Sequence, residues 1–175
     1  MNIPSSRNPS IASSINPFIA SSISPRIASS LNPRVASSIN PFVASSLNPR
    51  TASSINPRTA SSLNYRISSS INPQISSSIN PAISPSLNPN IASNIEGLYI
   101  FDLQLRAIGF TVTANNDVTL IFGPTCQFEG VLVAANKDFR NEFDLNNEWV
   151  GFWVHASDNT WLRFDLSVNW IGFTT

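Results

Sequence analysis

Proline returns at a fixed interval through the first half of the chain, eight or sixteen residues apart, as in SINPFIASSISPRIA. The repeating unit is (Ile/Leu)-Asn-Pro-x-(Ile/Val/Thr)-(Ala/Ser)-Ser-Ser. It runs from about Asn8 to Asn94 without insertion or deletion, and Tyr65 fills the one slot that lacks proline. A period this strict predicts a repeat architecture rather than a loose linker. No enzyme site needs such a repeat, so it points first to a role in shape.

Each octad contains two apolar slots, one before asparagine and one after x, and the second is always β-branched. An α-helix is excluded, because proline in every copy costs roughly 3 kcal/mol and a period of eight turns the apolar face by about 80° per copy. Polyproline II has three residues per turn, which does not divide eight. In extended chain, residues four apart lie on one side, so we expect both slots to face one way. Asn-Pro is a strong turn former. Each octad is therefore predicted to be a turn followed by a short strand.

Such a strand buries only two apolar side chains, which does not offset the cost of ordering its backbone. It must pack on copies of itself. The predicted fold class is thus all-β, with residues 1–95 forming an octapeptide-repeat β shaft, either an intertwined fibre or an intrachain β-solenoid. The apolar residues predicted to make assembly contacts are Ile15, Ile19, Leu31, Val35 and Leu47.

The second half of the chain, residues 96–175, has a different pattern. Apolar and polar residues alternate in short segments such as 98–105 and 118–122, and turn clusters such as Asn115-Asn116-Asp117 separate them. Short strands at this spacing are typical of antiparallel β proteins. We expect a small antiparallel β-sandwich or barrel that forms a head domain.

Charge divides the chain at the same boundary. Residues 1–95 hold six arginines and no acid, whereas residues 96–175 hold ten acids and four bases, so the halves carry +6 and −6. Arginine binds carboxylates in a bidentate geometry. We therefore expect shaft arginines of one subunit to contact the head of another. The arginines predicted to make these contacts are Arg26, Arg34, Arg50, Arg58 and Arg66.

No catalytic or metal-binding motif is recognisable. Cys126 is the one cysteine and His155 the one histidine, and no third group that would orient them is evident. We expect no enzyme activity, no metal and no cofactor. Tryptophans on strands also form sugar-binding platforms, so a glycan site is a second possibility. The residues predicted for it are Trp149, Trp153, Trp161 and Trp170.

A repetitive β shaft followed by a compact β head resembles the fibre and appendage proteins of viruses, phages and spore surfaces, by architecture only. This resemblance implies a non-enzymatic, self-associating fibre, filament or surface-appendage subunit. The alternative is a receptor- or glycan-binding adhesin on a repetitive stalk. The expected partners are copies of the chain, as a trimer or filament, with a receptor or glycan as a further option; nucleic acid is not expected.

The expected location is extracellular or on a particle surface, such as a virion, phage, spore or cell appendage. The first ten residues, MNIPSSRNPS, contain no apolar segment of the kind found in a signal peptide. Nowhere do eighteen apolar residues run together, so we expect no membrane span.

Overall fold

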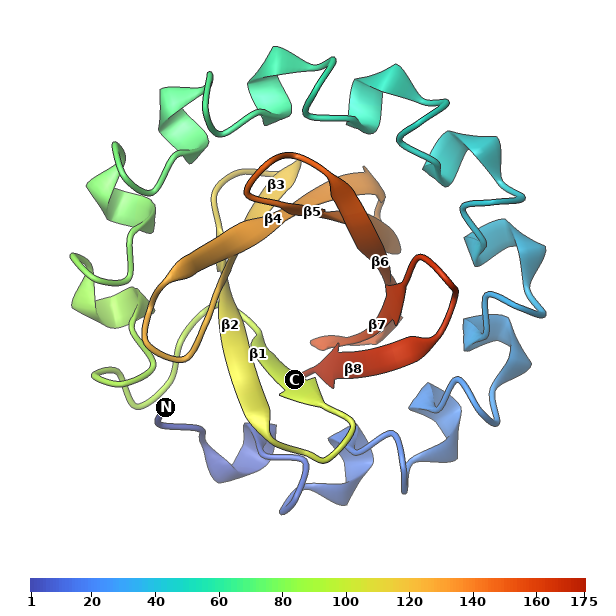
Figure 1. Cartoon of the computed structure of the whole chain (residues 1–175). Coiled ribbons are helices and arrows are strands. Elements are labelled where there is room, and N and C mark those ends of the chain that lie inside the picture. The colour runs from blue at the N-terminus through green and yellow to red at the C-terminus, as the bar shows by residue number, and fades with distance from the viewer.

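The computed structural model of the chain, which describes residues 1–175, is all-β and contains a closed barrel of eight antiparallel strands. Consecutive strands pair with one another, and β1 pairs with β8 to close the barrel. The octad repeat surrounds this barrel as a ring (Figure 1). The strands are β1 (Tyr99–Asp102), β2 (Ala107–Thr113), β3 (Val118–Phe122), β4 (Phe128–Asn136), β5 (Phe139–Asp144), β6 (Trp149–Ser157), β7 (Thr160–Asp165) and β8 (Trp170–Thr174).

The repeat folds into short 3-10 helices joined by turns, so the strands expected from its sequence are absent. The reason lies in local hydrogen bonds. The backbone oxygen of Asn16 accepts the N–H groups of Ile19 at 2.9 Å and Ala20 at 2.8 Å, and its side-chain oxygen accepts the N–H of Phe18 at 2.9 Å. Backbone groups satisfied within an octad need no neighbouring strand. The 3-10 helices are η1 (Ser5–Arg7), η2 (Ser13–Ile15), η3 (Ser21–Ile23), η4 (Ser29–Leu31), η5 (Ser37–Ile39), η6 (Ser45–Leu47), η7 (Ser53–Ile55), η8 (Ser61–Leu63), η9 (Ser69–Ile71), η10 (Ser77–Ile79) and η11 (Pro85–Leu87). None of the helices is long and apolar enough to cross a bilayer.

The two apolar slots face opposite directions, so the expectation that both face one way is wrong. In the inner slot, before asparagine, Ile71 exposes 1% of its surface, whereas in the outer slot, after x, Ile67 exposes 66%. A 3-10 helix advances three residues per turn, which breaks the two-residue alternation of a strand. Among the predicted assembly residues, the inner row contains Ile15, Leu31 and Leu47, and the outer row contains Ile19 and Val35.

Residues 1–95, called the belt from here on, close into a ring around the barrel (Figure 1). The N–H of Asn2 donates to the carbonyl of Pro89, so the two ends of the belt meet. The guanidinium of Arg7 bridges the belt to the start of the barrel, with bonds to the carbonyls of Ile95 at 2.9 Å and Gly97 at 2.8 Å. In this structure the repeat is therefore a closed belt and not an extended shaft with a head at its tip.

The main apolar core lies outside the barrel, between its outer face and the belt. Inner-row side chains such as Leu47, Leu63 and Ile71 belong to one buried cluster with the aromatic residues of the strands. Phenylalanines dominate the outer face and stack in cross-strand pairs, with ring centroids 5.3–5.6 Å apart. These pairs are Phe101 with Phe173, Phe110 with Phe122, Phe139 with Phe152, and Phe152 with Phe164.

The barrel consists of four hairpins that repeat one pattern every 21 residues. A phenylalanine is the last or next-to-last residue of the first strand of each hairpin, at Phe101, Phe122, Phe143 and Phe164. The turn that follows contains a residue with a φ of 57–65°, at Leu105, Cys126, Asn147 and Val168. All four of these turns lie at one end of the barrel, called the turn end here. The opposite end, called the mouth, carries the β2–β3, β4–β5 and β6–β7 turns and the C-terminus.

The inside of the barrel is narrow and partly polar. A Cβ atom at Gly130 or Gly151 would come within 2.4–2.5 Å of a carbonyl oxygen on the neighbouring strand, so glycine is required there. Deeper inside, Arg163 donates two hydrogen bonds to Glu142, at 2.6 and 2.8 Å, and the indole of Trp153 donates a third at 2.6 Å. Burial lowers the pKa of Arg163, but the bonds and charge of Glu142 outweigh burial and raise it above the ordinary value. The buried charges are thus paired within the barrel.

The inner row of the belt should carry a large part of the folding energy. Ile71→Ala should lower the free energy of unfolding by about 2–5 kcal/mol, because it leaves a cavity in the shared core. Ile67→Ala, four residues away on the exposed row, should change it by less than about 0.5 kcal/mol. Urea denaturation followed by tryptophan fluorescence measures both. Equal effects would show that the belt does not pack on the barrel as described.

Candidate functional site

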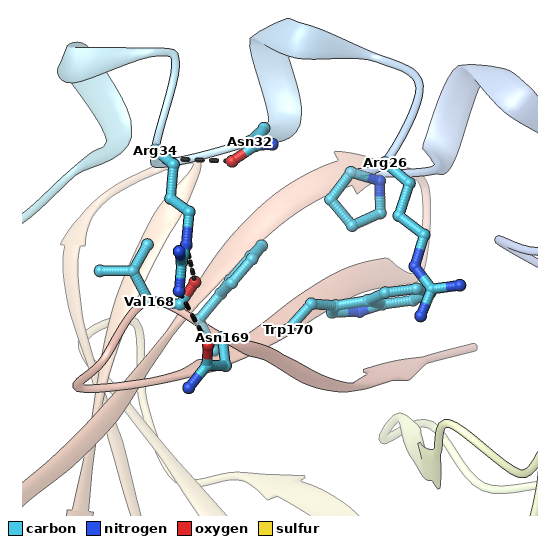
Figure 2. A pocket seen from close by; sticks show the side chains of 8 residues that line it. Arg26, Asn32, Arg34, Val168, Asn169 and Trp170 are labelled. Atoms are coloured by element: carbon cyan, nitrogen blue, oxygen red, sulfur yellow. Dashed lines mark hydrogen bonds between the residues drawn. The ribbon is translucent and has the colours of Figure 1, made fainter.

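A hollow of about 350 Å³ lies at the turn end, where the belt meets the β7–β8 turn. Figure 2 shows how its two arginines are used. Arg34 reaches across from the belt and donates to the carbonyl of Val168 at 3.1 Å and to the side chain of Asn169 at 2.8 Å. Arg26 lies over the indole of Trp170, 5.2 Å from the ring centroid. Because both arginine side chains already contact groups of the same chain, this hollow is part of the contact between belt and barrel and is not a free binding site.

Several further variable slots of the octads make comparable contacts with the turn end. Phe42 and Arg50 cover Trp149, with centroid distances of 5.5 and 5.3 Å. Arg58 forms an ion pair with Glu148, and Arg66 donates to the carbonyl of Leu145 at 2.6 Å. The arginines predicted to contact the head of another subunit therefore contact the barrel of their own chain.

The contacts between slot x and the barrel follow a regular spacing that can be read in the sequence. Slot x contains Phe-Arg-Arg twice in succession, so the pattern repeats after three octads, or 24 residues. Its targets, Trp170 and Trp149, are 21 residues apart and belong to neighbouring hairpins. Three octads of the belt thus match one hairpin of the barrel. The order is reversed, because the earlier octads contact the last hairpin and the later octads contact the hairpin before it. The first set is Phe18, Arg26 and Arg34, and the second is Phe42, Arg50 and Arg58.

The four tryptophans predicted as a glycan platform do not form one exposed surface. Trp153 is completely buried and Trp161 exposes 6% of its surface, and both lie inside the barrel. Trp149 and Trp170 lie on the outside and are covered by the belt. Simple alternation would place Trp149 and Trp153 on the same face of β6, but a register shift opposite Glu142 and Phe143 lies between them and puts them on opposite faces.

The mouth of the barrel contains a smaller pocket of about 250 Å³ with convergent polar groups. Arg140 lies in it with its guanidinium carbon 4.5 Å from the ring centroid of Trp161, and it donates to the hydroxyl of Thr119 at 3.1 Å. Burial lowers the pKa of Arg140. On the other side of the pocket, His155 lies 4.9 Å from Trp161, centroid to centroid, and its Nδ1 is 3.3 Å from a carboxylate oxygen of Asp138. Neither Arg140 nor Asp138 was singled out from the sequence, because their spacing matches no known motif.

The single cysteine and the single histidine lie at opposite ends of the barrel. Cys126 belongs to the β3–β4 turn at the turn end, whereas His155 lines the mouth. Burial raises the pKa of the Cys126 thiol, which disfavours the reactive thiolate. No group of three or more His, Cys, Asp or Glu side chains is arranged to hold a metal ion.

Comparison with known proteins finds no family model, curated protein or solved structure that matches the chain. The resemblance to shaft-and-head fibre proteins therefore stays a prediction.

The hairpin turns should make stability depend on acid pH. Burial raises the pKa of Asp165, but hydrogen bonds from Asn169 and Ser167, together with the charge of Arg34, outweigh it and hold the pKa below the ordinary value. A group whose pKa is lowered on folding stabilises the fold above its unfolded pKa, about 3.9 for aspartate, and loses that effect as the pH falls through the folded pKa.

Asp165→Asn should therefore lower the free energy of unfolding at pH 7 and make it depend less on pH below about 4. Denaturant unfolding at a series of pH values measures this. Glu96→Gln is the control, because Glu96 accepts no hydrogen bond from another residue. If the free energy of unfolding falls as steeply below about pH 4 in Asp165→Asn as in the parent chain, the prediction is contradicted.

Proposed function

We propose that the protein is a non-enzymatic structural subunit that self-associates through the outer row of its belt. The observation that carries this proposal is the exposure of the row. Nine large aliphatic side chains, one in each of nine octads, expose 62–68% of their surface to solvent. They are Ile11, Ile19, Ile27, Val35, Val43, Ile67, Ile75, Ile83 and Ile91.

Local structure does not require these side chains to be apolar. Two octads carry threonine in the same slot, and there the hydroxyl finds partners: Thr51 donates to the carbonyl of Ser45 at 2.8 Å, and Thr59 to that of Ser53 at 2.6 Å. A residue that forms such bonds suits an exposed slot, whereas isoleucine and valine leave apolar surface in water. Repeated apolar exposure at a fixed spacing favours an interaction surface.

A second copy of the chain is the partner that we propose for this surface. Most octads present the same Ser-Ser and β-branched pattern, so many octads of one copy can meet many octads of another. The belt is curved, so each contact involves few octads and is weak alone. Many equivalent sites around one molecule then favour extended assemblies over a closed dimer. Such a subunit suits a particle surface or cell appendage.

The alternative, a receptor- or glycan-binding adhesin, has less support. The sequence favoured a glycan site because of the four tryptophans, but these are buried inside the barrel or covered by the belt. The apolar outer row is the larger unexplained surface, so self-association is the function we favour.

Threonine substitution in the outer row tests the proposal, because the belt already accepts threonine there. A variant with Ile19, Ile27, Val35, Ile67 and Ile75 all replaced by Thr should remain folded and monomeric at concentrations where the parent chain assembles. Sedimentation velocity and negative-stain microscopy measure assembly. Sulfate should strengthen assembly of the parent chain, since it strengthens apolar burial.

The matched control places the same number of threonines on the belt without removing apolar surface, at Ser13, Ser21, Ser29, Ser37 and Ser69, all exposed. It should assemble like the parent. A parent chain that stays monomeric at high concentration, or a threonine variant that assembles equally well, would refute self-association through the outer row.

A further inference from the structure

The mouth of the barrel departs from the fourfold pattern of the hairpins. Each hairpin contributes one side chain to the rim of the mouth, from the start of its first strand or the residue just before it. These equivalent positions are Leu98, Thr119, Arg140 and Trp161. The Phe and Gly positions of the hairpins, by contrast, carry the same residue in all four copies, at Phe101 and Gly109 and their equivalents. The shared scaffold thus presents four chemically different groups around one opening.

The guanidinium of Arg140 lacks a counter-charge in the protein. No carboxylate oxygen lies within 4.0 Å of its nitrogens, and its hydrogen bond to a side chain goes to a neutral hydroxyl. Arg163, one layer deeper on β7, is bound by Glu142 through two hydrogen bonds. Arg140 is half-buried against Trp161, so part of its hydration is also lost. An arginine with fixed geometry, partial burial and free donors is a site for an oxyanion.

None of the carboxylates at the mouth supplies a counter-charge to Arg140. Asp138 is within reach of Lys137, at 3.9 Å, and of His155, at 3.3 Å. Glu96 and Asp158 also line the pocket, but both lie beyond ion-pair distance from Arg140. His155 is held by Asp138 and by the backbone carbonyl of Asp158, at 3.0 Å from its Nε2. The chain thus leaves one cation open to a bound molecule.

We propose that the mouth of the barrel binds a small anionic molecule, a carboxylate or phosphate compound, through the guanidinium of Arg140. Trp161 fixes the plane of the guanidinium and Thr119 fixes its rotation, which leaves the remaining donors directed at the ligand. The volume, about 250 Å³, holds about eight water molecules at about 30 Å³ each. The ligand is therefore of metabolite size and not a polymer. The site is remote from the outer row of the belt, so the two proposals stand or fall independently.

The experiment is a titration of the full-length, ¹⁵N-labelled chain with sodium phosphate and, separately, sodium succinate, at an ionic strength held constant with sodium chloride. The Arg140 Nε–H and Trp161 indole resonances should shift and saturate with at least one of the two anions, while the Arg163 Nε–H resonance stays in place. Saturation by phosphate or by succinate alone identifies the preferred oxyanion.

Arg140→Gln should weaken binding at least about tenfold, because it removes a charge-assisted contact. Arg140→Lys keeps the charge but loses the planar fork, and should bind with intermediate affinity. Arg106→Gln is the control at the turn end and should bind like the parent chain. The unshifted remainder of each spectrum shows that the variants are folded. Non-saturating shifts with both anions, or equal affinity in Arg140→Gln, would overturn the proposal.

Discussion

The contact between the inner row of the belt and the outer face of the barrel is the interaction on which the rest of the structure depends. The strands place phenylalanines on the outside, where a free barrel would expose them to water, and the belt supplies the isoleucines and leucines that cover them. The belt in turn has only one buried apolar side chain per octad, too few for a core of its own. Neither part has a complete core without the other, so the molecule should unfold as one unit.

The sequence predicted the period of the repeat and the all-β character of the second half, because both depend on local patterns. It failed where partners distant in the chain decide. Extended geometry placed Ile67 and Ile71 on one side, but turns satisfied within each octad put them on opposite sides. Likewise, charge composition identified Arg58 as a contact residue but could not show that Glu148 of the same chain is its partner. Arg140 and its pocket depend on the closure of the barrel, for which the sequence contains no motif.

Positions that hold the same residue in every or almost every repeat, called regular here, differ in place from positions that vary between repeats, called irregular. Regular positions build the scaffold: asparagine caps every octad but one, where Ser24 takes its place, phenylalanine and glycine recur in each hairpin, and three octads match one hairpin. Irregular positions lie where the scaffold opens to solvent, above all at the mouth, where Leu98, Thr119, Arg140 and Trp161 occupy equivalent places. A repeated frame needs the same residue wherever the surroundings are the same, whereas recognition of an asymmetric molecule needs different ones.

The order of the two parts along the chain has a consequence for biosynthesis. The belt leaves the ribosome before residues 96–175, which form the surface that it must wrap. Its closing contacts include a bond from the hydroxyl of Thr175, which follows β8, to the carbonyl of Arg7. Because the inner row of the belt has its core only against the barrel, we expect the belt to complete its packing after the barrel has been synthesised. A belt of local turns is suited to this delay, because it presents no unpaired strand edge to which other nascent chains could add.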